Sequence, residues 1–165
     1  MEINVRIALE KDLEEIIAIY NQAIKTKMSV AYIDELSMED RREWFHEHKK
    51  DKYPILLAEN TNMVLGWTSI SPYRKGREAL AKTVEVSYFV HNDFKQKGIG
   101  SRLLAEMLKK AKGLGYETIF AIILDKNIGS EKLLEKNNFE KWGVLPEVAE
   151  IDGIKMSHVY YGIKL

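Results

Sequence analysis

Apolar and polar positions change their period several times along the chain, and each change predicts an element. Residues 3–7 alternate, as is typical of a strand, and residues 11–25 place apolar side chains at helical spacing. Ser37, followed by acidic residues, predicts the start of a second helix with Trp44 and Phe45 on its buried side. The chain is therefore expected to open with one strand and two helices.

The middle of the chain predicts three strands. Residues 53–59 and 64–73 are apolar runs on either side of an asparagine-rich turn at 60–62, which predicts a hairpin. A basic connector at 74–77 leads to residues 83–90, where apolar and other positions alternate with a period of two. We expect this last strand to be the centre of the fold, because the most distinctive motif of the chain follows it.

That motif is a short loop that ends in two glycines. Beyond it, from Ile99 onward, apolar positions follow one face of a helix. Gly98 and Gly100 leave backbone N–H groups unshielded at the start of this helix, where the helix dipole favours an anion. Two lysines in the loop add positive charge. The pattern predicts a cradle for a phosphate.

The rest of the chain adds a buried strand, a helix and two more strands. Residues 119–124 are continuously apolar, which is typical of a strand covered on both faces. Residues 127–138 follow a helical pattern, and residues 139–145 and 154–165 predict two strands. Without repeats or linkers, the pattern predicts a mixed α/β fold in a single domain over residues 1–165.

Composition removes several classes of function. The 165 residues contain 25 Lys plus Arg and 25 Asp plus Glu, so net charge does not favour nucleic acid or a membrane surface. Cysteine is absent, which excludes disulfides, thiolate metal sites and a cysteine nucleophile. No membrane-length apolar run or signal-peptide pattern occurs, so a cytoplasmic protein is expected. His46 and His48 are two apart on a predicted helix and cannot share a face, so no metal site is expected.

Several kinds of glycine-rich loop could explain the motif. A nucleotide-binding P-loop needs a lysine after its last glycine, where this chain has Ser101. A dinucleotide fingerprint needs a third glycine where Leu103 stands, and a tighter turn than residues 91–97 allow. A glycine pair that serves only as a turn device stays possible from the loop alone.

An acyl-coenzyme A site fits the residues better. The sequence Lys95-Gln-Lys-Gly-Ile-Gly follows the run Thr-Val-Glu of the central strand, Tyr53-Pro precedes an earlier strand, and Asn127 and Ser130 follow the buried strand. In this combination the chain resembles the GNAT acetyltransferase superfamily, and within it the phosphinothricin N-acetyltransferases. Lys95 departs from the Gln or Arg of the family motif.

The resemblance implies a fold and a co-substrate. The fold is α/β (α+β), a mixed and mostly antiparallel central sheet flanked by helices, in the order β-α-α-β-β-β-α-β-α-β-β. The co-substrate is acetyl-CoA, with its pyrophosphate on the glycine loop and its pantetheine paired with the central strand. The residues implied to contact it are Tyr88, Phe89, Val90, Gln96, Lys97, Gly98, Ile99, Gly100, Ser101 and Asn127. Asn127 is equally compatible with an ordinary helix cap.

The resemblance also implies catalytic roles. Glu85 takes the place of the family glutamate and is the candidate base for the acceptor amine, whereas the residues alone favour a solvated glutamate or an ion pair with Arg77. A backbone N–H near Phe89 could stabilise the thioester oxygen. The tyrosine that protonates the thiolate in many relatives is replaced by Leu134. His158, Tyr160 or Tyr161 could substitute for it, or the thiolate could leave unaided.

For the acceptor, Arg77 matches an arginine that could bind a carboxylate, and Tyr32 and Tyr73 could line the pocket. The implied reaction is direct attack by the amine of a small amino-acid analogue, such as phosphinothricin or methionine sulfoximine, in a ternary complex. Acetylation of a protein N-terminus or lysine, and a non-catalytic coenzyme A-binding module, are the alternatives. The resemblance also implies a homodimer, with neither nucleic acid nor membrane as partner.

Overall fold

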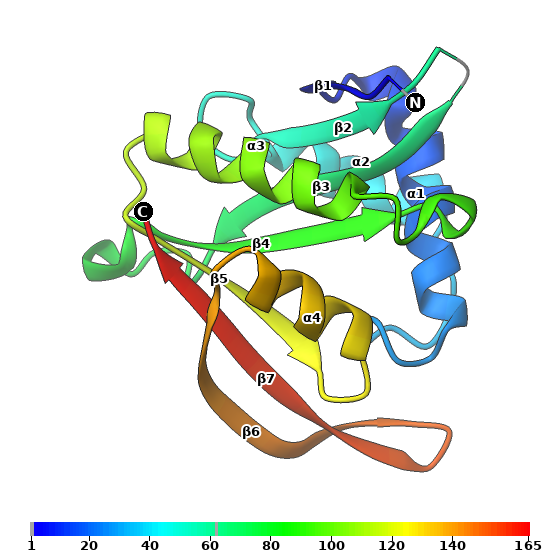
Figure 1. Cartoon of the computed structure of the whole chain (residues 1–165), viewed down its shortest axis with the longest axis vertical. Helices are drawn as coiled ribbons and strands as arrows, with labels where there is room; N and C mark the ends of the chain where they lie inside the picture. Colours follow the sequence, from blue (N-terminus) through cyan, green and yellow to red (C-terminus); the bar gives the residue numbers. More distant parts are fainter. Residues whose placement is uncertain (1, 62) are drawn as a thin grey trace.

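The computed structural model describes residues 2–61 and 63–165, which form a seven-stranded sheet with helices on both faces (Figure 1). The strands are β1 (Asn4–Ile7), β2 (Ile55–Glu59), β3 (Val64–Pro72), β4 (Thr83–Val90), β5 (Thr118–Leu124), β6 (Glu140–Ile151) and β7 (Ile154–Lys164). The helices are α1 (Leu13–Lys25), α2 (Met38–Glu47), α3 (Ile99–Gly113) and α4 (Ile128–Lys136), with short 3-10 turns η1 (Glu10–Asp12), η2 (Glu78–Leu80) and η3 (Asn92–Phe94).

The sheet has the order β1-β2-β3-β4-β5-β7-β6, and only the β4–β5 neighbours are parallel. Their pairing covers only Thr83 to Glu85 of β4 against Thr118 to Phe120 of β5. Beyond these residues the two strands separate. This separation, which we call the fork, interrupts the sheet at its centre (Figure 1).

Helices α3 and α4 cover one face of the sheet (Figure 1). Most of the apolar stripe of α3 is buried, and Leu104 and Met107 pack with Val84 and Val86 of β4 in the largest core cluster. The same cluster contains Leu134 of α4, which is 0% exposed. The alternation of β4 therefore points its even-numbered side chains toward α3 and α4, and Glu85 toward the opposite face.

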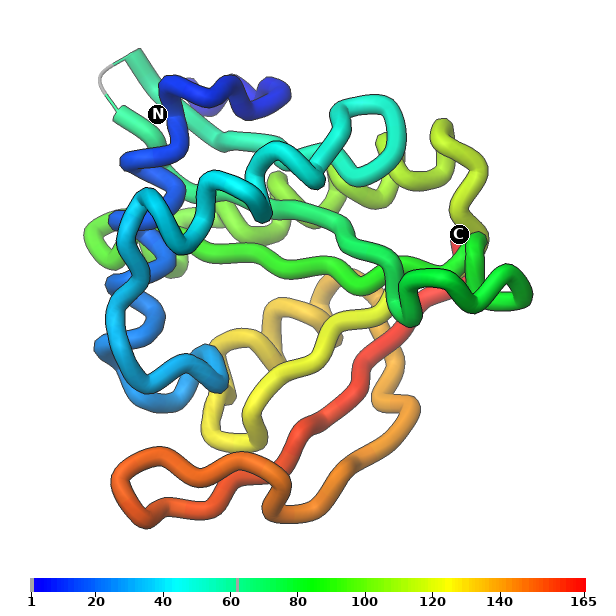
Figure 2. The backbone as a smooth tube through the Cα atoms, turned by 180° about the vertical axis from the view of Figure 1, so that it is seen from behind, coloured from blue at the N-terminus to red at the C-terminus, as the bar shows by residue number. Residues whose placement is uncertain are grey.

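Helices α1 and α2 cover the opposite face, over β2, β3 and β4 (Figure 2). Their core is aromatic: Tyr20 of α1, Trp67 of β3 and Phe89 of β4 lie with ring centroids 4.7 to 6.0 Å apart. Trp67 also donates a hydrogen bond from its indole nitrogen to the Ile16 carbonyl at 3.0 Å, which fixes α1 on the sheet. Strands β5, β7 and β6 have no helix on this side (Figure 2).

The element order and mixed sheet predicted from the sequence are confirmed. Ser37 caps α2, because its side chain accepts from the Asp40 N–H at 3.2 Å while Asp40 accepts from the Ser37 N–H at 2.7 Å. Strand β6 continues to Ile151, six residues beyond the predicted 139–145, because it pairs with β7 along its length. Part of the turn predicted at 60–62 lies outside the described residues. No helix in the described part of the chain has the length and apolar character needed to cross a membrane.

Candidate active site

The fork opens into a cavity of about 690 Å³ that reaches both faces of the sheet. On the side of α3 and α4, which we call the cofactor side, it is bordered by the glycine loop and the start of α4. On the side of α1 and α2, the acceptor side, it is bordered by the connector 29–32, by α2, and by the floor of β3 and β4. Glu85 lies at the closed end of the fork, where the pairing of β4 with β5 stops.

The glycine loop supplies backbone donors to the cofactor side. Gln96 has φ 61° and Gly98 has φ 81°, so the chain makes two left-handed residues before α3 begins. In the described chain, no protein acceptor is paired with the N–H groups of residues 96–101, and the first bond of α3 runs from Arg102 N–H to the Gly98 carbonyl. The loop therefore has the form of an anion cradle at a helix N-terminus.

Glycine is required at each of the two loop positions for a different steric reason. A Cβ on Gly98 would meet no protein atom within 4 Å and would project into open space beside the cradle. A Cβ on Gly100 would lie 2.8 Å from Cδ2 of Leu133, which lines the cavity from α4. Gly98 thus provides the left-handed turn, and Gly100 provides the close approach of α3 to α4.

The register of β4 determines which backbone groups face the fork. His91 N–H bonds to the Leu65 carbonyl at 2.9 Å, and Tyr73 N–H to the Thr83 carbonyl at 3.4 Å, so odd-numbered residues of β4 bond toward β3. The backbone groups of Tyr88 and Val90 consequently point to the other side, where β5 has separated. Phe89 directs its own N–H toward β3, so the backbone groups near Phe89 that face the fork are those of Tyr88 and Val90.

Glu85 is partly buried on the acceptor face of β4. Burial raises the pKa of its carboxyl above the usual range, and no hydrogen bond or ion pair to it occurs in the described structure. The ion pair with Arg77 that the sequence allowed is therefore not formed. A carboxylate that is desolvated and free of a cation partner is a stronger base than an exposed one.

Asn127 lies at the opposite border of the cofactor side. Its Oδ1 accepts a hydrogen bond from the Ser130 N–H at 3.1 Å, so it caps α4 while its side chain also lines the cavity. Tyr88 reaches the same helix, with its hydroxyl 3.5 Å from the Ser130 carbonyl. Asn127 thus caps α4 and lies beside the cofactor side, and its expected contact with the cofactor stays a prediction.

The acceptor side contains an arginine enclosed by aromatic rings. The guanidinium of Arg41 lies 4.7 Å from the ring centre of Tyr20, 4.8 Å from that of Trp44 and 5.5 Å from that of Tyr32. Burial raises the pKa of Tyr20 to about 12, although the neighbouring guanidinium opposes this shift. None of the ion pairs among the described residues involves Arg41. Its charge remains available to an anion in the cavity.

Most of the predicted site residues meet at this cavity. Those that line it are Tyr32, Glu85, Tyr88, Phe89, Val90, Gln96, Gly98, Ile99, Gly100, Ser101, Asn127 and His158. Those that do not are Lys97, Tyr73 and Arg77. Lys97 bonds to the Asp93 carbonyl at 2.9 Å, Tyr73 packs on Phe120, and Arg77 lies in the exposed connector after β3. The functional roles of all these residues stay predictions.

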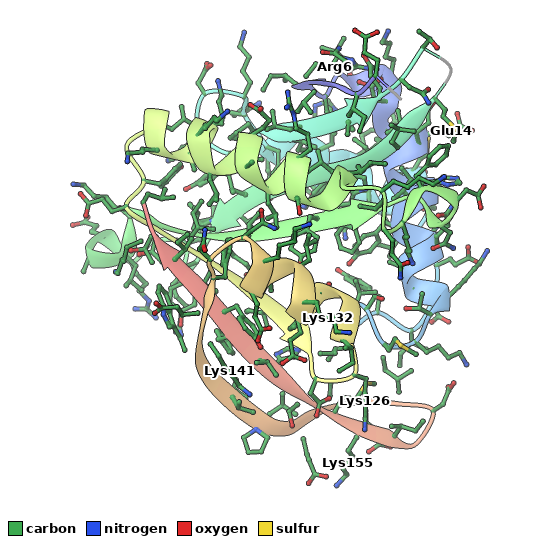
Figure 3. The ribbon with its side chains drawn as sticks, viewed as in Figure 1. Arg6, Glu14, Lys126, Lys132, Lys141 and Lys155 are labelled. Carbon is green, nitrogen blue, oxygen red and sulfur yellow. The ribbon has the colours of Figure 1, made fainter. Side chains whose placement is uncertain are left out.

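Three cationic side chains at the cavity were not predicted from the sequence. They are Arg41 on the acceptor side and Lys132 and Lys136 of α4 on the cofactor side. Lys132 projects from α4 (Figure 3), and Lys136 lies one turn further along the same helix. The two lysines share a helix face at i, i+4, a signal that the sequence contained. Arg41 had no such signal, because its surroundings come from α1, α2 and the connector between them.

The fold and the cavity define a class of protein: a mixed sheet opened between two parallel strands, with an anion cradle at the next helix. The family model "Acetyltransferase (GNAT) domain" matches residues 3–140, and the chain belongs to this family. It is accordingly an acetyl-CoA-dependent acetyltransferase.

Individual relatives narrow the class. YwnH of Bacillus subtilis (strain 168) is 41% identical over 149 residues, which cover 90% of each chain. Its name assigns it provisionally to the phosphinothricin acetyltransferases. The L-methionine sulfoximine/L-methionine sulfone acetyltransferase of Pseudomonas aeruginosa is 32% identical over 151 residues, 91% of this chain and 87% of that one. The structure of YncA from Salmonella typhimurium, solved with acetyl-CoA, has a TM-score of 0.91 at 25% identity and covers 98% of this chain and 93% of its own.

Proposed function

We propose that this protein transfers the acetyl group of acetyl-CoA to the amine of a small amino-acid-like acceptor, by direct attack in a ternary complex. The observation that supports this most directly is the cavity that passes through the fork from one face of the sheet to the other. Such a passage lets two substrates approach Glu85 from opposite sides. A binding module for coenzyme A alone would need only the cofactor side.

On the cofactor side, the pyrophosphate would lie on the N–H groups of residues 96–101. Lys132 and Lys136 would add positive charge for the remaining phosphate of the cofactor. The pantetheine arm would pair with the backbone of Tyr88 and Val90, which face the fork. The same edge offers an N–H donor for the thioester oxygen, so we assign this role to Tyr88 or Val90, the two neighbours of Phe89.

At the fork, Glu85 would act as the base. A lysine-like amine has a pKa near 10 and arrives as an ammonium ion, so one proton must leave before nitrogen can attack. Burial raises the pKa of Glu85 and so reduces the difference between the pKa of the carboxyl and that of the amine. Leu134 is buried and apolar and cannot protonate the thiolate. Tyr161 donates its hydroxyl to Glu131 at 2.9 Å, and Tyr160 does not line the cavity. His158, on the cavity wall, is therefore the candidate acid, and unaided departure of the thiolate is the alternative.

On the acceptor side, Arg41 would bind an anionic group of the acceptor. Its guanidinium is held between rings, carries no carboxylate partner in the described structure, and lies on the same side of the sheet as Glu85. Amino-acid analogues combine an amine with such an anion, and the names of YwnH and the Pseudomonas aeruginosa relative refer to acceptors of this kind. Arg77, the arginine expected from the sequence to bind a carboxylate, does not line the cavity.

The test is to follow free thiol release from acetyl-CoA with a panel of acceptors. The panel contains phosphinothricin, methionine sulfoximine, methionine sulfone, proteinogenic amino acids, plain alkylamines and short peptides. Turnover is expected with the amino-acid analogues and weak or absent with peptides. Release with peptides alone would favour a protein acceptor, and the absence of turnover with every amine would refute the proposal.

Three broader predictions accompany this function. They are a single catalytic domain over residues 1–165, a cytoplasmic location and a homodimer. Gel filtration with light scattering measures the last of these.

A further inference from the structure

His48, at the end of α2, makes two hydrogen-bond contacts that together determine which of its ring nitrogens carries the hydrogen. Its Nδ1 lies 2.7 Å from the carbonyl oxygen of Trp44, and its Nε2 lies 3.2 Å from the hydroxyl oxygen of Ser71. The imidazole also packs on the Trp44 ring, with centroids 4.4 Å apart. The ring therefore has one orientation, and each nitrogen has a defined partner.

The chemistry of these partners determines the tautomer. A carbonyl oxygen only accepts, so Nδ1 must carry the hydrogen. Burial lowers the pKa of His48 and outweighs the opposite effects of the Trp44 carbonyl and Glu47, so the ring is neutral at neutral pH. Nε2 then has a lone pair, and the Ser71 hydroxyl must donate to it. The hydrogen of Ser71 is thereby committed to His48, and the lone pairs of Ser71 are left for other donors.

Ser71 lies directly across the strand pair from Glu85. The two residues are register partners in β3 and β4, and both line the acceptor side of the cavity. They belong to the hydrogen-bonded set of pairs, whose Cα atoms are typically about 5.5 Å apart with both side chains on one face. A group bound beside Glu85 therefore lies within reach of the Ser71 oxygen.

We propose that His48 holds Ser71 as a hydrogen-bond acceptor for the amine that Glu85 deprotonates. This role rests on the proposed function. Nitrogen of a primary ammonium loses two protons during acetyl transfer: one through Glu85 to solvent, and one to the departing thiolate. The third hydrogen stays on the product amide. Ser71 accepts a hydrogen bond from this retained N–H and orients the nitrogen lone pair toward the thioester. Ser71 contacts the substrate, and His48 is a positioning residue.

Acid reverses this arrangement. A protonated His48 donates from Nε2 to Ser71, and the Ser71 hydrogen then turns toward the cavity and faces the hydrogens of the amine. The charged groups around the pair are Arg41 and Glu47 on α2, Lys75, which lies 3.3 Å from Glu47, and Glu85 on β4. Protonation of His48 should therefore weaken amine binding, and because burial lowers the pKa of His48, this should happen at a pH below the usual histidine pKa.

The experiment compares Ser71→Ala, His48→Gln and the double variant. Loss of one hydrogen bond predicts about a tenfold fall in kcat/KM for the amine in Ser71→Ala, with an unchanged KM for acetyl-CoA. Glutamine offers an oxygen to Ser71 but does not titrate. His48→Gln should therefore lose the histidine contribution to the acid limb of the pH profile of kcat/KM. His46→Gln, at an exposed position of α2, is the matched control and should leave this profile unchanged.

The double variant separates positioning from a structural role. If His48 acts through Ser71, adding His48→Gln to Ser71→Ala should cause no further change in the pH profile. An unchanged kcat/KM in Ser71→Ala, or a further change in the acid limb when His48→Gln is added to Ser71→Ala, would overturn the proposal. Thermal unfolding of each variant identifies any loss of folded protein.

A readout independent of activity completes the test. Nitrogen-15 chemical shifts of the His48 ring should show hydrogen on Nδ1 and a lone pair on Nε2 at pH 7. Hydrogen on Nε2 in an active enzyme would refute this inference alone. The expected tautomer in a protein that acetylates no amine would refute the proposed function, and with it the role of Ser71.

Discussion

Glu85 is the residue on which the proposed chemistry depends, and its surroundings make the prediction specific. It lies at the closed end of the fork without a cation partner in the described chain, and burial raises its pKa. Replacement by glutamine keeps the shape and removes the base. We expect kcat to fall by about 10²- to 10⁴-fold, the usual contribution of general-base catalysis, with little change in acetyl-CoA affinity. Glu140→Gln, at an exposed position of β6, is the control, and equal losses in both variants would contradict the assignment.

The same substitution predicts a pH-dependent change in stability. Because the folded-state pKa of Glu85 is raised, its ionised form opposes folding, and this cost appears as the pH rises through the folded-state pKa. Glu85→Gln should therefore have a higher Tm than the wild type at pH 7. The difference should shrink as the pH falls below the ordinary glutamate pKa, where both side chains are neutral. Thermal unfolding across this range measures it, and a difference that does not vary with pH would argue against burial of the charge.

Arg41 gives a test of acceptor specificity. A hydrogen bond to a charged group contributes about 1.5–3 kcal/mol, so Arg41→Gln should raise the KM of anion-bearing amines about ten- to a hundredfold. Amines without an anionic group should change far less. Arg77→Gln is measured beside it with the same pair of amines. If Arg77→Gln alone separates the two amines, the carboxylate role belongs to the exposed connector and not to α2.

At the scale of single residues, the sequence indicated which side chains could take part in the reaction better than it indicated what surrounds them. Glu85 and the glycine loop could be found because strand alternation and helix-start chemistry are local. Arg41, Ser71 and His48 could not, because each also has a partner in an element far away in sequence. For His48, only the fold shows that the Trp44 carbonyl and Ser71 engage its two nitrogens.

At the scale of elements, the cradle before α3 can be tested with a matched pair of glycines. Gly98 has φ 81° and Gly115, after the end of α3, has φ 88°, and a Cβ on either would meet no protein atom within 4 Å. Alanine at either position should cost about 1–2 kcal/mol of stability through the left-handed backbone. Only Gly98→Ala adds a methyl group beside the cradle, so only it should weaken acetyl-CoA binding. Calorimetric titration measures this, and equal affinities in the two variants would contradict the cradle.

The elements themselves were largely predictable, and the exceptions have physical causes. Strand 119–124 is a continuous apolar run and the helix after Ile99 has a strong period, and both elements are found where expected. The long β6 was underestimated, because its outer residues are exposed and its pairing with β7 replaces burial as the source of order. In α2, Trp44 and Phe45 were expected to be buried but are half-buried, because this helix forms a wall of the cavity.

At the scale of the molecule, the fork makes a prediction about the order of chemical events. One cavity joins the cofactor side to the acceptor side, and the chain contains no cysteine that could carry an acetyl group between them. Both substrates should therefore be bound before transfer. Initial rates at varied acetyl-CoA and amine should give intersecting double-reciprocal lines. Acetyl-CoA without amine should release no stoichiometric thiol and leave the protein mass unchanged.

Parallel lines together with an acetylated protein would instead show a covalent intermediate and refute direct attack. The Glu85→Gln variant strengthens this test, because it should slow transfer without preventing assembly of the complex. With this variant, acetyl-CoA and the amine should each still raise the Tm, and together they should raise it further. A failure of the amine to stabilise the variant in the presence of acetyl-CoA would place the acceptor outside the fork.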